Sequence, residues 1–164
     1  MMDIGTNKQH FLMTGGIFAH EEAHVVTTIL GSCISVCLWD PVGKVGGINH
    51  YMLPLWNGEG LATPKYGSIA IPKLIEKMIG LGCSKKNLRA KIFGGGEVFN
   101  GSSFPVKIGD RNIHLAQDLL EAEKIPVVGF DMGGKTGRKI LYHTGTGDVL
   151  VKRLKQQVDD VKTS

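Results

Sequence analysis

A cysteine and a histidine near the start of the chain stand where alternating apolar patterns break. Cys33 follows the β-branched run 24–30, which suits a buried strand. His50 comes seventeen residues later, after a turn predicted at 40–43 by its Pro and Gly. Such a turn makes its two flanking strands antiparallel neighbours, which places His50 near the level of Cys33. We expect Cys33 to act as a thiolate paired with His50, the arrangement of a nucleophilic cysteine and its base.

The two residues before the cysteine, Gly31 and Ser32, predict a tight turn. Its free backbone N–H groups would face an oxyanion, with the Ser32 hydroxyl in support. The alternative interpretation is structural. Most cysteines are small buried hydrophobic residues, and a single histidine on a strand is usually a satisfied core residue. Spacing alone leaves both interpretations open.

Several segments resemble the CheD family, the chemoreceptor glutamine deamidases of bacterial chemotaxis. In order along residues 16–154 they are TTILGSCISV, DPVGKVGGINHYMLP, IFGGGEVF, IGDRN and DMGGKTGRKI. The GSC followed by NHYMLP at this spacing is the most specific part. The resemblance implies that Cys33 is the nucleophile, that His50 is its base and that Thr27, six residues before the cysteine, completes a triad.

The same resemblance implies the reaction and the partners. It implies hydrolysis of glutamine amides on the cytoplasmic helical domain of a chemoreceptor, through a cysteine thioester and without a cofactor. It also implies binding of the CheC phosphatase, so a non-enzymatic adaptor is one alternative. A cysteine peptidase or transglutaminase is another, because the same pair serves any acyl transfer. Ser68 stands where the family often has Asp, and 94–96 is GGG where the family has GGA, so the substrate side differs in detail.

Length and composition indicate one globular domain. The chain has 164 residues, of which 42% are hydrophobic, and we place the domain at 11–154, between a loose N-terminus, 1–10, and a frayed polar tail, 155–164. The net charge of +4 is a mild excess without the basic, aromatic surface of a nucleic-acid-binding protein, although it suits an acidic partner. Three cysteines without a CxxC pair, and no membrane span or signal peptide, predict a cytoplasmic protein.

Two motifs resemble binding sites for which we predict no such function. His20 and His24 flank two glutamates, but the run that follows is a strand sequence without HExxH, so we predict no metal site. The segment 129–136, GFDMGGKT, matches the phosphate-binding P-loop pattern letter for letter. A P-loop needs a helix directly after its lysine, whereas Gly137 and a strand pattern follow here. We therefore predict no nucleotide binding.

The remaining patterns predict two helices among many strands. An apolar stripe over 68–82 predicts the first helix, and Asp110 or Asn112 is the expected N-cap of the second. The 23 glycines favour tight turns and a strand-rich fold. We predict a single α+β domain in which mixed sheets pack as a sandwich flanked by both helices. The family resemblance implies the fold of the cysteine deamidase toxins.

Overall fold

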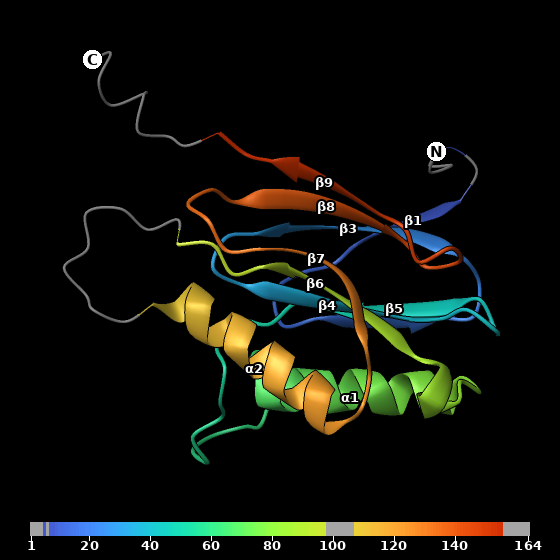
Figure 1. Ribbon diagram of the computed structural model, residues 1–164, viewed down its shortest axis with the longest axis horizontal. Helices are drawn as coiled ribbons and strands as arrows, with labels where there is room; N and C mark the ends of the chain where they lie inside the picture. Colours follow the sequence, from blue (N-terminus) through green and yellow to red (C-terminus); the bar gives the residue numbers. More distant parts are fainter. Residues whose placement is uncertain (1–4, 6, 98–106, 156–164) are drawn as a thin grey trace.

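The computed structural model describes residues 5, 7–97 and 107–155. This part of the chain forms two β-sheets and two α-helices (Figure 1). The strands are β1 Lys8–Phe11, β2 Ile17–His20, β3 His24–Leu30, β4 Ile34–Asp40, β5 Val45–Asn49, β6 Arg89–Gly94, β7 Val127–Met132, β8 Arg138–His143 and β9 Val149–Arg153. The helices are α1 Gly67–Gly80 and α2 Ile108–Ala122, with a short 3-10 helix, η1, at Lys85–Asn87.

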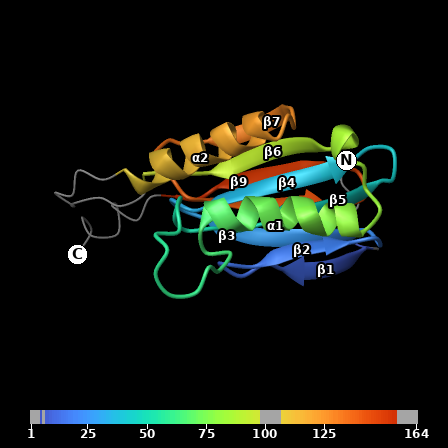
Figure 2. The same ribbon diagram turned by 90° about the horizontal axis from the view of Figure 1, so that it is seen from below.

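The two sheets pack face to face, and each mixes parallel and antiparallel pairs. We call the four-stranded sheet β1-β3-β8-β9 the outer sheet and the five-stranded sheet β2-β5-β4-β6-β7 the central sheet. Among the described strands, β1 with β3 and β6 with β7 pair in parallel, and the remaining strand pairs are antiparallel. Both helices cover the face of the central sheet that points away from the outer sheet (Figures 1 and 2). The predicted α+β sandwich with flanking helices is confirmed.

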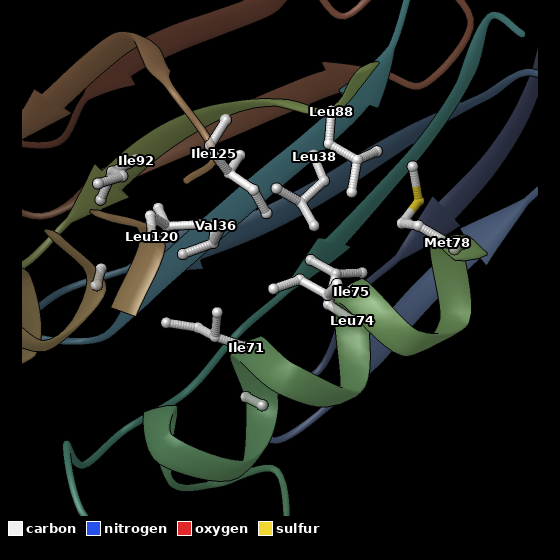
Figure 3. Packing of buried hydrophobic residues seen from close by; sticks show 14 of the residues in the cluster. Val36, Leu38, Ile71, Leu74, Ile75, Met78, Leu88, Ile92, Leu120 and Ile125 are labelled. Atoms are coloured by element: carbon white, nitrogen blue, oxygen red, sulfur yellow. The ribbon is translucent and has the colours of Figure 1, made fainter. Parts of the chain in front are cut away.

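Two hydrophobic cores follow from this layering. One lies between the central sheet and the helices, and the other, which includes Val26, Leu30, Cys37, Ile48 and Tyr142, lies between the sheets. Each fully buried aliphatic side chain contributes roughly 1.5–3 kcal/mol relative to exposure. Figure 3 shows members of the first core from both helices, from strands β4 and β6 and from the connecting segments: Val36, Leu38, Ile71, Leu74, Ile75, Met78, Leu88, Ile92, Leu120 and Ile125.

The hairpin of β4 and β5 confirms the turn predicted at 40–43. The carboxylate of Asp40 accepts hydrogen bonds from the N–H groups of Val42 at 2.9 Å and Gly43 at 3.2 Å, which closes the turn. The strands on either side are antiparallel, with Cys37 opposite Ile48. This register decides which side chains meet in the candidate site.

The N-terminal part of the structure and the start of α2 differ from the sequence-based expectation. Residues 8–10, predicted to be loose, belong to β1 and pair with β3, while the predicted tail lies outside the described residues except for Lys155. The expected cap of α2 is wrong. Lys107 holds the N-cap position without a side-chain hydrogen bond, and Asp110 and Asn112 lie inside the helix.

The segment 129–136 runs from β7 through a glycine turn into β8, Arg138–His143. A strand therefore follows Thr136 where a P-loop would begin a helix. None of the described helices has the length and apolar character needed to span a membrane.

Candidate active site

Cys33 immediately precedes β4 and His50 immediately follows β5, so the two residues lie at the same end of this strand pair. Ile34 and Tyr51 exchange backbone hydrogen bonds of 3.0 and 2.9 Å, which extends the antiparallel register of β4 and β5. Because side chains alternate between the faces of a strand, the preceding residues, Cys33 and His50, both face the outer sheet. They are diagonal neighbours in this register, a relation across which long side chains still meet.

A threonine on β3 fixes the His50 ring. The hydroxyl of Thr28 donates to the carbonyl oxygen of Leu12 at 2.8 Å and lies 2.7 Å from Nδ1 of His50. Since the hydroxyl proton is used, the Thr28 oxygen accepts from Nδ1–H, and the second ring nitrogen, Nε2, keeps its lone pair. Nε2 lies 3.5 Å from the hydroxyl oxygen of Thr14. A general base needs such an unprotonated Nε2.

Burial keeps both members of the pair neutral. It lowers the pKa of His50 to about 4. It also raises the pKa of the half-buried Cys33 thiol, an effect that the residue's own backbone N–H partly offsets. Near neutral pH the site therefore holds a thiol and a neutral imidazole rather than the thiolate expected from the sequence.

Thr27 lies on the other face of β3. It pairs with Phe11 and Leu141 across the outer sheet, and its neighbour Thr28 is the fully buried residue that points into the sandwich. The hydroxyl that contacts His50 is therefore one residue later than the resemblance implied. The cause is strand alternation, because adjacent residues of β3 necessarily face opposite sides.

The glycine segment 94–96 packs against the turn that carries Cys33. The N–H of Gly95 donates to the carbonyl oxygen of Cys33, and the N–H of Gly96 donates to that of Gly31, both at 2.9 Å. A side chain at Gly94, whose φ is +106°, would collide with the Cys33 carbonyl oxygen. The segment thus packs tightly against the turn that carries Cys33 and supports it.

In the turn before Cys33 the carbonyl groups accept hydrogen bonds from other segments, whereas the N–H groups remain available to a ligand. The carbonyl of Gly31 is taken by Gly96, and that of Ser32 by the side chain of Asn112 at 3.0 Å. The N–H groups of Ser32 and Cys33 donate to no other residue in the described part of the chain. These are the N–H groups that the sequence analysis predicts to face an oxyanion.

The histidines predicted not to bind metal make local contacts. Nδ1 of His20 accepts from the N–H of Glu22, and Nδ1 of His24 lies 2.9 Å from the Glu22 carbonyl oxygen. Within the described ranges, no three His, Cys, Asp or Glu side chains are grouped so that they could hold a metal ion.

Comparison with known proteins identifies the family. The sequence model described as CheD chemotactic sensory transduction matches residues 52–153. A probable chemoreceptor glutamine deamidase CheD of Trichlorobacter lovleyi is 52% identical over 150 residues, 92% of this chain and 93% of that protein. A protein of the same name from Sulfurimonas denitrificans is 41% identical over 146 residues, which cover 88% and 94% of the two chains. The chain belongs to the CheD family. The resemblance of its motifs is thereby confirmed.

Three residues of this CheD chain lie around the site, although the sequence analysis did not assign them to it. Arg138 is fully buried, and its guanidinium donates to the carbonyls of Gly94 at 2.7 Å and Gly133 at 2.6 Å, which ties two glycine turns together. Ser35 lies opposite His50 in the extended register, and its buried hydroxyl has no partner in the described residues. Asn112 is the third.

Asn112 joins the cysteine turn to the histidine strand. Its side-chain NH₂ donates to the carbonyl oxygen of Ser32 at 3.0 Å and to that of Met52 at 2.8 Å. These two acceptors fix the orientation of the amide, because a flipped side chain would place its oxygen against the two carbonyl oxygens. Asn112 therefore sets the separation between the segments that carry Cys33 and His50.

We expect Asn112→Leu to lower the free energy of unfolding by roughly 2 kcal/mol, because two main-chain carbonyls lose their donor. Urea unfolding would measure the loss. Gln117→Leu, at an exposed position of the same helix, is the matched control. Equal stability of the two variants would contradict the proposed link.

The low pKa of His50 makes stability depend on pH. A histidine that is neutral when buried takes up a proton more readily when unfolded, so the free energy of unfolding should fall as pH drops from 6.5 towards about 4. The expected loss is roughly 3 kcal/mol. Urea unfolding of the wild type and of His50→Gln across this range would measure it, with exposed His114→Gln as the control. A wild-type curve as flat as that of His50→Gln would contradict the assignment.

Proposed function

We propose that this chain is a protein-glutamine deamidase that converts glutamine side chains of chemoreceptors to glutamate and releases ammonia. The carrying observation is that Cys33 and His50 are diagonal neighbours in the register of β4 and β5, and that Thr28 holds Nδ1 of a neutral His50, which leaves Nε2 as the unprotonated nitrogen. Support comes from relatives named as probable chemoreceptor glutamine deamidases. Cys33 and His50 come from the same chain, at the paired ends of β4 and β5, so the proposed site needs no residue from a second protomer.

The chemistry follows from these positions. The sulfur of Cys33 attacks the carboxamide carbon while its proton passes to Nε2 of His50. The N–H groups of Ser32 and Cys33 receive the developing oxyanion, Gly31 keeps the turn tight, and the Ser32 hydroxyl assists. His50 then protonates the departing ammonia, which leaves a thioester. Water, deprotonated by His50, hydrolyses the thioester and returns the thiol.

Thr28 acts through His50. By accepting Nδ1–H, its hydroxyl holds the imidazole in the tautomer that presents a basic Nε2 to the thiol. When the ring takes up the proton of Cys33, the same hydrogen bond stabilises the imidazolium. Thr28 thus takes the role for which the resemblance suggested Thr27.

The rim of the site suits a folded protein substrate. The loop 54–66 begins a few residues after His50 and returns at Tyr66, which forms an isolated bridge with Leu53. Two leucines of this loop are largely exposed, Leu55 at 65% and Leu61 at 83%. A glutamine side chain alone offers little binding energy, so contacts with such a rim are needed to orient the amide.

The test compares three substrates: a receptor cytoplasmic fragment, a short glutamine peptide and free glutamine. Ammonia release and the intact mass of the fragment should show deamidation of the fragment with much higher kcat/KM than the others. Leu55→Ser/Leu61→Ser should raise KM for the fragment alone. Comparable kcat/KM for all three would indicate a small-molecule amidase. An unchanged fragment mass, together with tight binding of CheC, would indicate an adaptor.

We place this reaction in the cytoplasm, with CheC as a partner. Cys33, Cys37 and Cys83 are all free thiols, as a reducing compartment requires. A free Cys33 is also a condition of the proposed chemistry.

A further inference from the structure

One face of the outer sheet, pointing away from the central sheet, carries no helix in the described part of the chain (Figure 1). A row of apolar character crosses this face, because Phe11, Thr27, Leu141 and Leu150 stand directly opposite one another on the four strands. Phe11 is 53% exposed and Leu150 is 48% exposed. We call this set the outer-face row.

A second row, next to the first, is basic. Ile29, 49% exposed, is paired with Lys139, which is paired with Lys152. Neither lysine forms an ion pair with a described acidic residue. The four strands of the outer sheet contain no Asp or Glu at all. The face therefore combines exposed apolar side chains with positive charge that is uncompensated on the sheet itself.

We propose that this face docks an acidic amphipathic helix of a protein partner. Apolar residues at helical spacing would cover the outer-face row, and Asp or Glu on the flank of that helix would meet Lys139 and Lys152. A helix fits because the surface is a sheet face with satisfied backbone groups and not a free edge. Uncompensated lysines select the sign of the partner's charge.

Other occupants fit the face less well. A second copy would bring the lysines of two identical basic faces together, in a chain whose net charge is already +4. Stable attachment to an anionic membrane generally needs a cluster of about four or more basic residues, whereas this face offers Lys139 and Lys152. An acidic helix satisfies both the apolar row and the charge.

The docking face borders the candidate active site at its basic end. Lys139 follows Arg138, whose guanidinium holds the Gly94 carbonyl beside the Cys33 turn. A helix seated on the lysine end would thus lie next to the loops that frame the thiol. The docking proposal itself does not depend on the chemistry of Cys33.

Fluorescence anisotropy of labelled synthetic peptides tests the proposal. One helical peptide carries leucines along one face with flanking glutamates, and its counterpart carries lysines in place of the glutamates. The glutamate peptide should bind the full chain, and Lys139→Glu/Lys152→Glu should raise its Kd about tenfold or more. The lysine peptide should prefer that variant. Lys73→Glu/Lys77→Glu, at exposed positions of α1, is the matched control and should change neither Kd.

Four outcomes would overturn the proposal. One is equal affinity of the glutamate peptide for the wild type and Lys139→Glu/Lys152→Glu. Another is a wild-type dimer that this variant dissociates, which would make a second copy the occupant. Binding to phosphatidylserine vesicles without binding to the peptide would assign the face to a membrane. Tighter peptide binding by Asp159→Asn/Asp160→Asn would mean that the chain's own C-terminal segment competes for the face.

Discussion

Cys33→Ala is expected to lose deamidase activity on a receptor fragment by about 10⁴-fold or more in kcat, as removal of a catalytic nucleophile does. The fold should remain, because the thiol is half-buried and its removal leaves the backbone bonds of Gly95 and Gly96 to this turn intact. Ammonia release would measure the activity, and a thermal melt would check the fold.

The matched control is Cys37→Ala, on β4, four residues after Cys33 and on the same face of the sheet. Cys37 is buried between the sheets, so this variant should lose some stability but keep its activity. Alkylation gives a second check. Cys33 is the most accessible of the three thiols, and burial raises the pKa of Cys83 to about 11. Faster labelling of Cys83 than of Cys33 would count against the nucleophile assigned here.

Thr28→Val should lower kcat by about 100-fold, because valine keeps the shape of the side chain but removes the acceptor of the His50 Nδ1–H. The ring then loses the hydrogen bond that fixes its tautomer. Thr28→Ser, which retains a hydroxyl, should recover much of the activity. Steady-state kinetics on the receptor fragment would measure both.

Thr27→Val is the control for this experiment, since the two threonines are adjacent and face opposite sides of β3. It should change kcat by less than about twofold. A larger loss in Thr27→Val than in Thr28→Val would restore the triad implied by the family resemblance.

The sequence was sufficient for features that depend on local pattern. The Asp40 turn fixes the antiparallel pairing of β4 and β5, so the positions of Cys33 and His50 could be counted from it. The helix over 68–82 was predicted from its apolar stripe, and α1 occupies Gly67–Gly80. In each case the information lies within a few residues of the feature.

Features set by tertiary contacts could not be predicted in this way. Asn112 fits the local pattern of a helix cap, yet its partners are on segments 60 and 80 positions away. Arg138 stands in a polar GRK segment that suggests a surface, but the sandwich buries it. Whether Thr27 or Thr28 contacts His50 depends on which face of β3 meets the central sheet. The turn at Gly31 interrupts the alternation of side chains, so this face cannot be deduced by counting back from Cys33.

The neutral state of the pair is another property of the fold. A cysteine and a histidine at this spacing suggest an ion pair, but burial disfavours the charged form of each group. A neutral thiol is a weaker nucleophile than a thiolate, so burial lowers the reactivity of Cys33 towards other electrophiles near neutral pH.

The most direct test of an acyl-enzyme on Cys33 is interception by hydroxylamine during turnover of a receptor fragment. A thioester formed after ammonia has left should be divided between water and hydroxylamine, so mass spectrometry should find a hydroxamate at the position that otherwise becomes glutamate. Its yield should rise with hydroxylamine at the expense of glutamate, and Cys33→Ala should form neither product. Continued ammonia release without any hydroxamate, or hydroxamate formation by Cys33→Ala, would contradict the thioester mechanism.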